Sequence, residues 1–280
     1  MSPSLRLPWM TRRRVLLDLL RRGRTFSYGS DRSQRADLRV PAGVGPHPVM
    51  VVIHGGSWQA RYGRIVMRGV ISDLVSRGWA SWNIEYRRVG NGGGWPATFE
   101  DVALAIDHLA GVDASLDLDR VSVLGHSAGG HLALWAAGRD GLPAGAPGAI
   151  AGRPRVLLRR AISLAGVCDL AGGYREWRGG AVRALMGGSP LRLPQRYAVA
   201  DPLANVPLRM PALLVHGVLD ETVSVRHSRD YARAALAAGG AVELVEIEGR
   251  GGRHRAHIDP RGAGWAAVTR WLAAQEQHRG

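Results

Sequence analysis

The sequence of 280 residues contains one cysteine, two phenylalanines and no long apolar run. A single cysteine, Cys168, excludes an intrachain disulfide, so nothing in the sequence demands an oxidising compartment. Cys168 closes a strand-like apolar segment, which predicts a small buried side chain rather than a reactive thiol. No stretch approaches the roughly 20 apolar residues of a membrane-spanning helix. We therefore expect a cytoplasmic protein without stable membrane insertion.

Lysine is also absent, so all 37 basic residues are arginine; with 23 acidic residues they give a formal net charge of +14. Such a surplus is one mark of proteins that bind nucleic acid or anionic membranes. Here the arginines are scattered, and no helix-turn-helix, zinc-finger or RNA-binding motif accompanies them. Abundant Ala, Gly and Arg beside scarce Lys and Phe are typical of a GC-rich genome. We therefore expect no nucleic-acid partner.

Strand-like and helix-like segments alternate along the chain, which predicts an α/β fold with a mostly parallel sheet and helices on both faces. Short β-branched runs predict strands at residues 49–53, 79–84, 121–124, 161–164, 212–216 and 242–247. Apolar residues at helical spacing predict helices at residues 64–77, 99–109, 131–137, 228–238 and 265–274. A chain of this length fits one domain, for which we expect residues 28–280.

Two segments fall outside this alternation. Residues 1–27 form a basic N-terminal arm, in which Arg12 to Arg22 predict a short amphipathic helix. Asp18 interrupts its apolar run, which argues against a signal peptide. Residues 170–209 are rich in Gly, Pro and Arg and show little periodicity. An insertion of this length in a compact domain is usually a lid or binding loop, so we expect a lid here.

The most informative motif is Gly125-His126-Ser127-Ala128-Gly129, a Gly-x-Ser-x-Gly sequence between a strand-like and a helix-like segment. This context is typical of a nucleophile elbow, in which a tight turn projects a serine hydroxyl from the carboxyl edge of the sheet. The two glycines leave room for backbone that must pass close by. We therefore expect Ser127 to be the nucleophile of an acyl-transfer reaction.

An acyl-transfer site also needs donors for the negative charge that develops on the substrate oxygen. One donor is expected from the backbone N–H of Ala128, the residue after the nucleophile. The loop His54-Gly55-Gly56-Ser57-Trp58 follows a predicted strand and supplies the second, from Gly56 or Ser57. We interpret the His54 ring as a brace for this loop. Trp58 and His126 are expected to contact substrate.

The acid and the base should follow the serine along the chain. Asp220 comes after the strand-like segment 212–216, at the edge of the sheet where ligands bind. Two histidines, His254 and His257, follow the last predicted strand. The glycine-rich loop before His254 favours it as the general base, with Asp220 holding its tautomer, and His257 stays open as the alternative.

These motifs resemble those of small α/β hydrolases of the esterase and kynurenine-formamidase-like branch, which are similar to dienelactone-hydrolase and prolyl-oligopeptidase-type domains. The resemblance extends from residue 28 to residue 272 and rests on these segments: Tyr28-Gly29, Gln34, Asp37-Leu38, His54-Gly55-Gly56-Ser57-Trp58, Asn83-Ile84-Glu85-Tyr86-Arg87, Gly125-His126-Ser127-Ala128-Gly129-Gly130, His216-Gly217 with Asp220, and His254 with Ile258-Asp259-Pro260. The segment before Ile258 is longer and richer in arginine than in such enzymes. Counting back from Ile258-Asp259-Pro260 selects His254 as the base.

The function implied by this resemblance is hydrolysis of a small carboxylic ester by a Ser-Asp-His triad. An arylformamidase acting on an N-formylkynurenine-type amide is the main alternative. A serine peptidase or a non-catalytic binding protein of the same fold is less favoured, because no gating domain is evident and all three triad residue types are present. We expect a small-molecule ester or amide substrate and no metal or other cofactor. A homodimer is compatible with the sequence.

Overall fold

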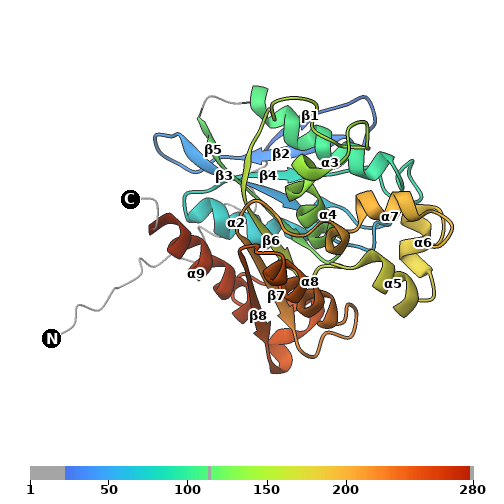
Figure 1. Cartoon of the computed structure of the whole chain (residues 1–280). Coiled ribbons are helices and arrows are strands. Elements are labelled where there is room, and N and C mark those ends of the chain that lie inside the picture. The colour runs from blue at the N-terminus through green and yellow to red at the C-terminus, as the bar shows by residue number, and fades with distance from the viewer. Residues whose placement is uncertain (1–22, 113–114, 278–280) are drawn as a thin grey trace.

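The computed structural model of the chain describes residues 23–112 and 115–277 and has an eight-stranded sheet at its centre (Figure 1). The strands lie in the order β1-β2-β4-β3-β5-β6-β7-β8. Their bounds are Arg24–Ser27, Arg35–Arg39, His47–Ile53, Ala80–Ile84, Leu116–His126, Leu158–Leu164, Ala212–Gly217 and Val242–Ile247 for β1 to β8. β2 pairs antiparallel with β1 and with β4, and all other neighbouring strands pair parallel. The predicted mostly parallel sheet is thus confirmed.

The direction in which the sheet grows reverses between β3 and β5. After β3 the chain adds β4 on one side, and it then returns to add β5 on the other side. In the parallel register of this pair, Ile53 lies opposite Gly125. The loops that follow β3 and β5 therefore leave the sheet at the same level, at the point where open α/β sheets bind their ligands.

Helices cover both faces of the sheet, because side chains of consecutive strand residues point in opposite directions. On one face α2 (Arg68–Ser76) and α9 (Ala263–Gln277) pack on strand residues such as Val52 and Leu124. On the other face α3 (Ala97–His108), α4 (Ala128–Ala137) and α8 (Arg226–Ala237) pack on residues such as Val51 and Val123. No helix in the described part of the chain is long and apolar enough to cross a membrane.

The segment 170–209 is more regular than its sequence predicts. It contains three helices of seven residues each, α5 (Leu170–Glu176), α6 (Gly180–Met186) and α7 (Pro194–Ala200), followed by the 3-10 turn η4 (Pro202–Asn205). The three helices lie together beside the sheet (Figure 1). Two turns of helix are too short to produce a readable apolar period, which is why the sequence of this segment shows little periodicity although it contains three helices. Whether this segment acts as a lid stays a prediction.

The N-terminal boundary also differs from the prediction. Residues 24–27, expected within the arm, form the edge strand β1, and β2 was not predicted at all. Both strands are largely polar, and in β2 only Ala36 and Leu38 contribute to the core. The helix expected at residues 12–22 lies outside the described residues. The remaining short 3-10 turns are η1 (Arg64–Met67), η2 (Leu109–Gly111), η3 (Arg139–Gly141), η5 (Gly249–Gly252) and η6 (His254–Ile258).

Candidate active site

Ser127 occupies a sharp turn between the end of β5 and the start of α4. Its backbone has φ 55° and ψ −122°, a conformation that costs a non-glycine residue energy and persists only where the surroundings hold it. Its N–H donates to the carbonyl oxygen of Leu164 at 2.8 Å, which ties the turn to the end of β6. The strand, the strained serine and the helix are those of a nucleophile elbow.

The two glycines of the motif permit backbone to pack directly on backbone. A Cβ atom on Gly125 would lie 1.9 Å from the carbonyl oxygen of Gly129. A Cβ atom on Gly129 would lie 2.2 Å from the carbonyl oxygen of Ile53, at the end of β3. The elbow is therefore closely packed both on itself and on the end of β3, and a side chain at either glycine would displace it.

His254 and Asp220 form a hydrogen-bonded pair at the carboxyl ends of β7 and β8. His254 Nδ1 lies 2.7 Å from Asp220 Oδ2, and the Asp220 side chain is fully buried. Asp220 Oδ1 accepts the N–H groups of Thr222 at 2.8 Å and Val223 at 3.0 Å. Burial alone would raise the pKa of Asp220, but the bond to His254 and these backbone donors lower it below its ordinary value. Asp220 is therefore an ionised acceptor that orients the His254 ring.

Two neutral histidines hydrogen-bond to the backbone segments that carry this pair. His216 Nε2 donates to the carbonyl oxygen of Val223 at 2.9 Å, which helps to shape the turn that carries Asp220. His126 Nε2 donates to the carbonyl oxygen of His254 at 2.9 Å. Burial lowers the pKa of His216 to about 4 and that of His126 to about 3. Both rings therefore act as neutral donors that hold backbone in place.

The other candidate base, His257, is placed differently. Its side chain is completely buried, it packs against Gly264, and burial lowers its pKa to about 4. The structure brings His254, and not His257, into hydrogen-bond contact with Asp220. Cys168 is also fully buried, and burial raises the pKa of its thiol to about 12, which does not suit a nucleophile.

The loop after β3 lies against the elbow. Gly56, Ser57 and Trp58 all have positive φ values, of 120°, 52° and 55°. A Cβ atom on the preceding Gly55 would lie 2.6 Å from the carbonyl oxygen of His126, so the loop runs close beside the strand end. Among the described residues, the N–H groups of Ser57 and Ala128 have no protein acceptor. These two donors are free to bind a substrate oxygen.

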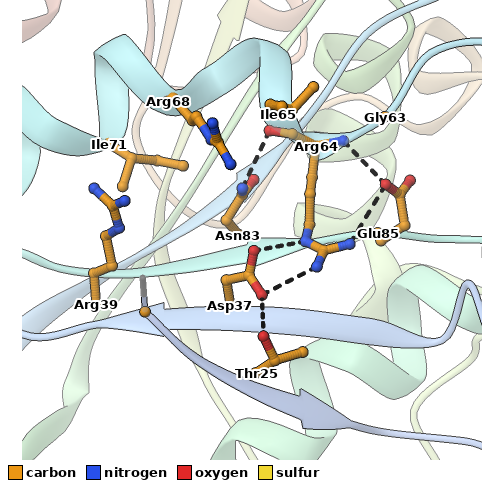
Figure 2. A pocket seen from close by; sticks show the side chains of 11 residues that line it. Thr25, Asp37, Arg39, Gly63, Arg64, Ile65, Arg68, Ile71, Asn83 and Glu85 are labelled. Carbon is orange, nitrogen blue, oxygen red and sulfur yellow. Dashed lines mark hydrogen bonds and ion pairs between the residues drawn. The ribbon is translucent and has the colours of Figure 1, made fainter. Parts of the chain in front are cut away.

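A buried ion-pair network holds this loop from the side of β4. His54 Nε2 donates to Glu85 Oε1 at 2.7 Å, and Arg88 binds the same oxygen at 2.8 Å. Glu85 Oε2 accepts the backbone N–H of Arg64, whose guanidinium pairs with Asp37 at 2.7 Å (Figure 2). Burial alone would raise the pKa of Glu85, but His54, Arg88 and the Arg64 N–H lower it. The interpretation of His54 as a brace agrees with these contacts.

Trp58 links the same loop to α4 and to the segment 170–209. Its ring is 1% exposed, and its Nε1 donates to His131 Nδ1 at 3.3 Å. His131 Nε2 in turn donates to the carbonyl oxygen of Ala200, at the end of α7, at 2.9 Å. Burial lowers the pKa of His131 to about 4, so the neutral ring can accept one bond and donate the other.

Two cavities meet at Ser127. The first has a volume of about 210 Å³ and is mainly apolar; its lining includes Ser57, Trp58, Ala128, Val167, Trp177, Ala181 and Val223. The second, of about 230 Å³, contains His254; its lining includes Gly55, Gly56, Ser57, Tyr62, Val66, His126, Thr222, Arg255 and Ile258. Trp58 and His126, the expected substrate contacts, thus line different cavities.

Sequence reasoning missed several residues that shape these cavities. Thr222, Trp177 and Arg255 belong to no sequence motif. Only the folding of the chain brings them into the walls of the cavities next to Ser127. Glu85 was noted as part of a motif but was assigned no role. An acidic residue directly after a predicted strand, at the same edge of the sheet as the His54 loop, is the signal that could have indicated its role.

Comparisons with known proteins agree with this architecture. The BD-FAE family model matches residues 37–234, more than half of the chain. The esterase LipC of Mycobacterium tuberculosis is 29% identical over 245 residues, which cover 81% of this chain and 59% of LipC. The esterase LipQ of the same organism is 29% identical over 209 residues, which cover 71% of this chain and 48% of LipQ. The chain thus spans about half the length of these curated relatives.

Solved structures of low sequence identity share the fold. A truncated carbohydrate esterase from gut microbiota has a TM-score of 0.77 and 20% identity, covering 91% of this chain and 97% of that chain. Esterase B from Lactobacillus rhamnosis has a TM-score of 0.76 and 19% identity, covering 95% of this chain and 90% of that chain. With the parallel sheet, the elbow and the family match, these likenesses confirm the predicted fold: the chain belongs to the BD-FAE family and has the α/β-hydrolase fold.

Proposed function

We propose that the chain is a serine hydrolase that cleaves a small carboxylic ester through an acyl-enzyme intermediate. The observation that carries the proposal is the position of Ser127, on a strained elbow where two cavities meet, with the His254–Asp220 pair in the wall of one of them. The esterases LipC and LipQ, to which the chain is similar over most of its length, support the same reaction class.

In the proposed reaction Ser127 Oγ attacks the acyl carbon while His254 Nε2 takes the hydroxyl proton. His254 then returns that proton to the alcohol oxygen, the C–O bond breaks and the alcohol leaves. A water molecule, deprotonated by the same ring, attacks the acyl-enzyme and releases the carboxylic acid. The ionised Asp220 stabilises the positive charge that His254 carries in both steps.

The negative charge on the substrate oxygen needs donors that are already in place. The N–H groups of Ala128 and Ser57 suit this role, because both residues line cavities next to Ser127 and neither N–H has a protein acceptor among the described residues. The sequence offers both Gly56 and Ser57 as the second donor. Ser57 borders both cavities, whereas Gly56 borders one, so we favour Ser57.

The two cavities also suggest how an ester lies in the site. The alcohol oxygen must come within hydrogen-bond reach of the base that protonates it. The cavity that contains His254 is therefore assigned to the alcohol part, and the apolar cavity next to Trp58 and Trp177 to the acyl part. A volume of about 210 Å³ suits a short acyl group.

The test compares wild type and Ser127→Ala on p-nitrophenyl acetate, p-nitrophenyl butyrate and N-formylkynurenine. We expect ester turnover that the substitution reduces by at least about 10³-fold. N-formylkynurenine tests the arylformamidase alternative, and a clear preference for it would replace the ester proposal by that one. Turnover that survives the substitution, or no turnover of any of the three, would contradict the proposal.

A further inference from the structure

Arg255 is the one arginine in either cavity next to Ser127, and no aspartate or glutamate lines them. It lies in η6, directly after His254, and its side chain is exposed. Within residues 23–112 and 115–277, no carboxylate pairs with it. An arginine keeps its charge at any physiological pH, so the cavity that contains His254 carries an uncompensated positive group at its wall.

Apart from Arg255, the lining of this cavity combines polar side chains, such as Thr222, with apolar ones. Tyr62, Val66 and Ile258 line it and offer carbon surface. A group that fits such a space combines an apolar body with an anionic end. A neutral alcohol would leave the guanidinium in contact with water alone, whereas a carboxylate can accept two parallel N–H bonds from it.

We propose that Arg255 selects esters whose alcohol part carries a carboxylate or another anionic group. The proposal rests on the proposed ester hydrolysis and on the assignment of the alcohol to the cavity that contains His254. The net charge of +14 acts in the same direction, because a positive protein attracts anionic substrates over distances beyond contact. Arg255 is thus a specificity-determining residue and takes no part in proton transfer.

The experiment uses a matched pair of aryl acetates, 4-acetoxybenzoate and its neutral methyl ester. Both carry the same acetyl group, and the leaving group has a carboxylate in one and the methyl ester of that carboxylate in the other. The intrinsic difference in reactivity between the two esters is the same for every enzyme form. The quantity compared is the ratio of kcat/KM for the anionic ester to kcat/KM for the neutral ester. Because each enzyme form is compared with itself, a general disturbance of the His254 turn cancels in this ratio.

Wild type, Arg255→Gln, Arg255→Lys and Arg253→Gln are measured at low ionic strength. We expect the ratio to fall about tenfold in Arg255→Gln, mainly through KM for the anionic ester. Arg255→Lys keeps the charge and should stay within about threefold of wild type. Arg253→Gln removes the same charge on the other side of His254, at a position outside both cavities, and should leave the ratio within about twofold. Added salt should lower the wild-type ratio.

Three results would overturn the proposal, and the failure of selectivity can be told apart from the failure of ester hydrolysis. If Arg255→Gln lowers kcat/KM equally for both esters, or if Arg253→Gln lowers the ratio as strongly, Arg255 has no selective role although ester hydrolysis stands. If wild type turns over neither ester, the proposed hydrolysis fails and the inference fails with it.

Discussion

At the glycines beside Ser127, where the ends of β3 and β5 meet the start of α4, the backbone leaves no space for side-chain atoms. Gly125, Gly129 and Gly55 each face a backbone carbonyl oxygen at less than 3 Å from where a Cβ atom would be. The strained backbone of Ser127 is held because these contacts leave it no alternative. Single atoms at this crossing therefore affect both the fold and the position of the nucleophile.

Gly125→Ala tests this close packing. The added methyl group would meet the carbonyl oxygen of Gly129 at 1.9 Å, so the elbow must shift. We expect a loss of about 3 kcal/mol in the free energy of unfolding, measured by urea denaturation. Gly141→Ala is the control, because nothing lies within 4 Å of its added Cβ atom, and its effect should stay within about 0.5 kcal/mol. Equal stability of the two variants would contradict the packing argument.

Glu85→Gln tests how far the loop after β3 depends on its buried carboxylate. Glu85 binds His54, Arg88 and the backbone of Arg64, so a neutral amide weakens the support of the loop that carries Ser57. We expect kcat for p-nitrophenyl acetate to fall about tenfold with little change in KM.

Asp37→Asn is the matched control for Glu85→Gln. Asp37 binds the Arg64 side chain (Figure 2). Among the described residues, no hydrogen bond or ion pair joins Asp37 to His54. Its substitution should leave kcat within about twofold of wild type. If both variants lower kcat equally, the effect comes from general loosening of this part of the sheet and not from the His54 contact.

At this scale, sequence reasoning could name only the candidate residues that carry a motif or follow a predicted strand, and it missed those that only the fold brings together. Ser127 has a motif, and Asp220 and His254 follow from chain order and strand ends. The contact between His254 and Asp220 agrees with that prediction, although the catalytic roles stay predictions. Thr222 and Arg255 line the same cavity as Ser127 because of the course of their loops, which no local sequence pattern predicts.

The helices of segment 170–209 are joined to the site by hydrogen bonds to buried rings. His131 on α4 links the end of α7 to Trp58, and Trp135 Nε1 donates to the carbonyl oxygen of Val199 at 3.1 Å. Trp177 and Ala181, from the same segment, line the acyl cavity. Because α5, which is directly followed by Trp177, packs against α7, we expect this cavity to depend on how α7 is attached to α4.

His131→Leu tests that attachment. The substitution leaves the Ala200 carbonyl oxygen and the Trp58 N–H buried without partners. We expect it to lower the free energy of unfolding by about 2–4 kcal/mol and to raise KM for p-nitrophenyl butyrate. His131→Gln, which offers both a donor and an acceptor, should recover part of each loss. A fully stable His131→Leu variant would show that these bonds contribute little.

At the scale of elements, prediction succeeded where burial imposes a clear apolar period. The strand predicted at 242–247 has those bounds, and the strand predicted at 212–216 is one residue longer. It failed for β2, in which Ala36 and Leu38 are the only apolar residues, and for the two-turn helices α5 to α7. In these segments tertiary contacts, rather than the local pattern, decide the structure.

The whole molecule contains several histidines that burial keeps neutral. Burial lowers the pKa of His131, His216 and His257 to about 4 and that of His126 to about 3. In the unfolded chain these groups take up protons near pH 6.5. Asp201 has the opposite effect on stability, because burial raises its pKa to about 7. As the pH falls, the folded chain therefore binds this proton at a higher pH than the unfolded chain does.

Stability should therefore fall as the pH is lowered from about 6.5 toward 4. In this window the unfolded chain binds protons at the four histidines, and the folded chain binds one at Asp201, so unfolding takes up protons on balance. We expect the free energy of unfolding to drop by at least about 1.4 kcal/mol per pH unit, the value for one net proton. Urea denaturation at pH 7, 6 and 5 measures this slope. A free energy of unfolding that stays constant or rises as the pH is lowered from 7 to 5 would contradict the burial of neutral histidines.

The central claim, that Ser127 is the nucleophile, is tested most directly by a fluorophosphonate probe and mass spectrometry of the labelled peptides. The account predicts one adduct per chain, on the peptide that contains Ser127, and none in Ser127→Ala. An adduct on another residue, or no adduct on folded wild-type protein, would contradict it.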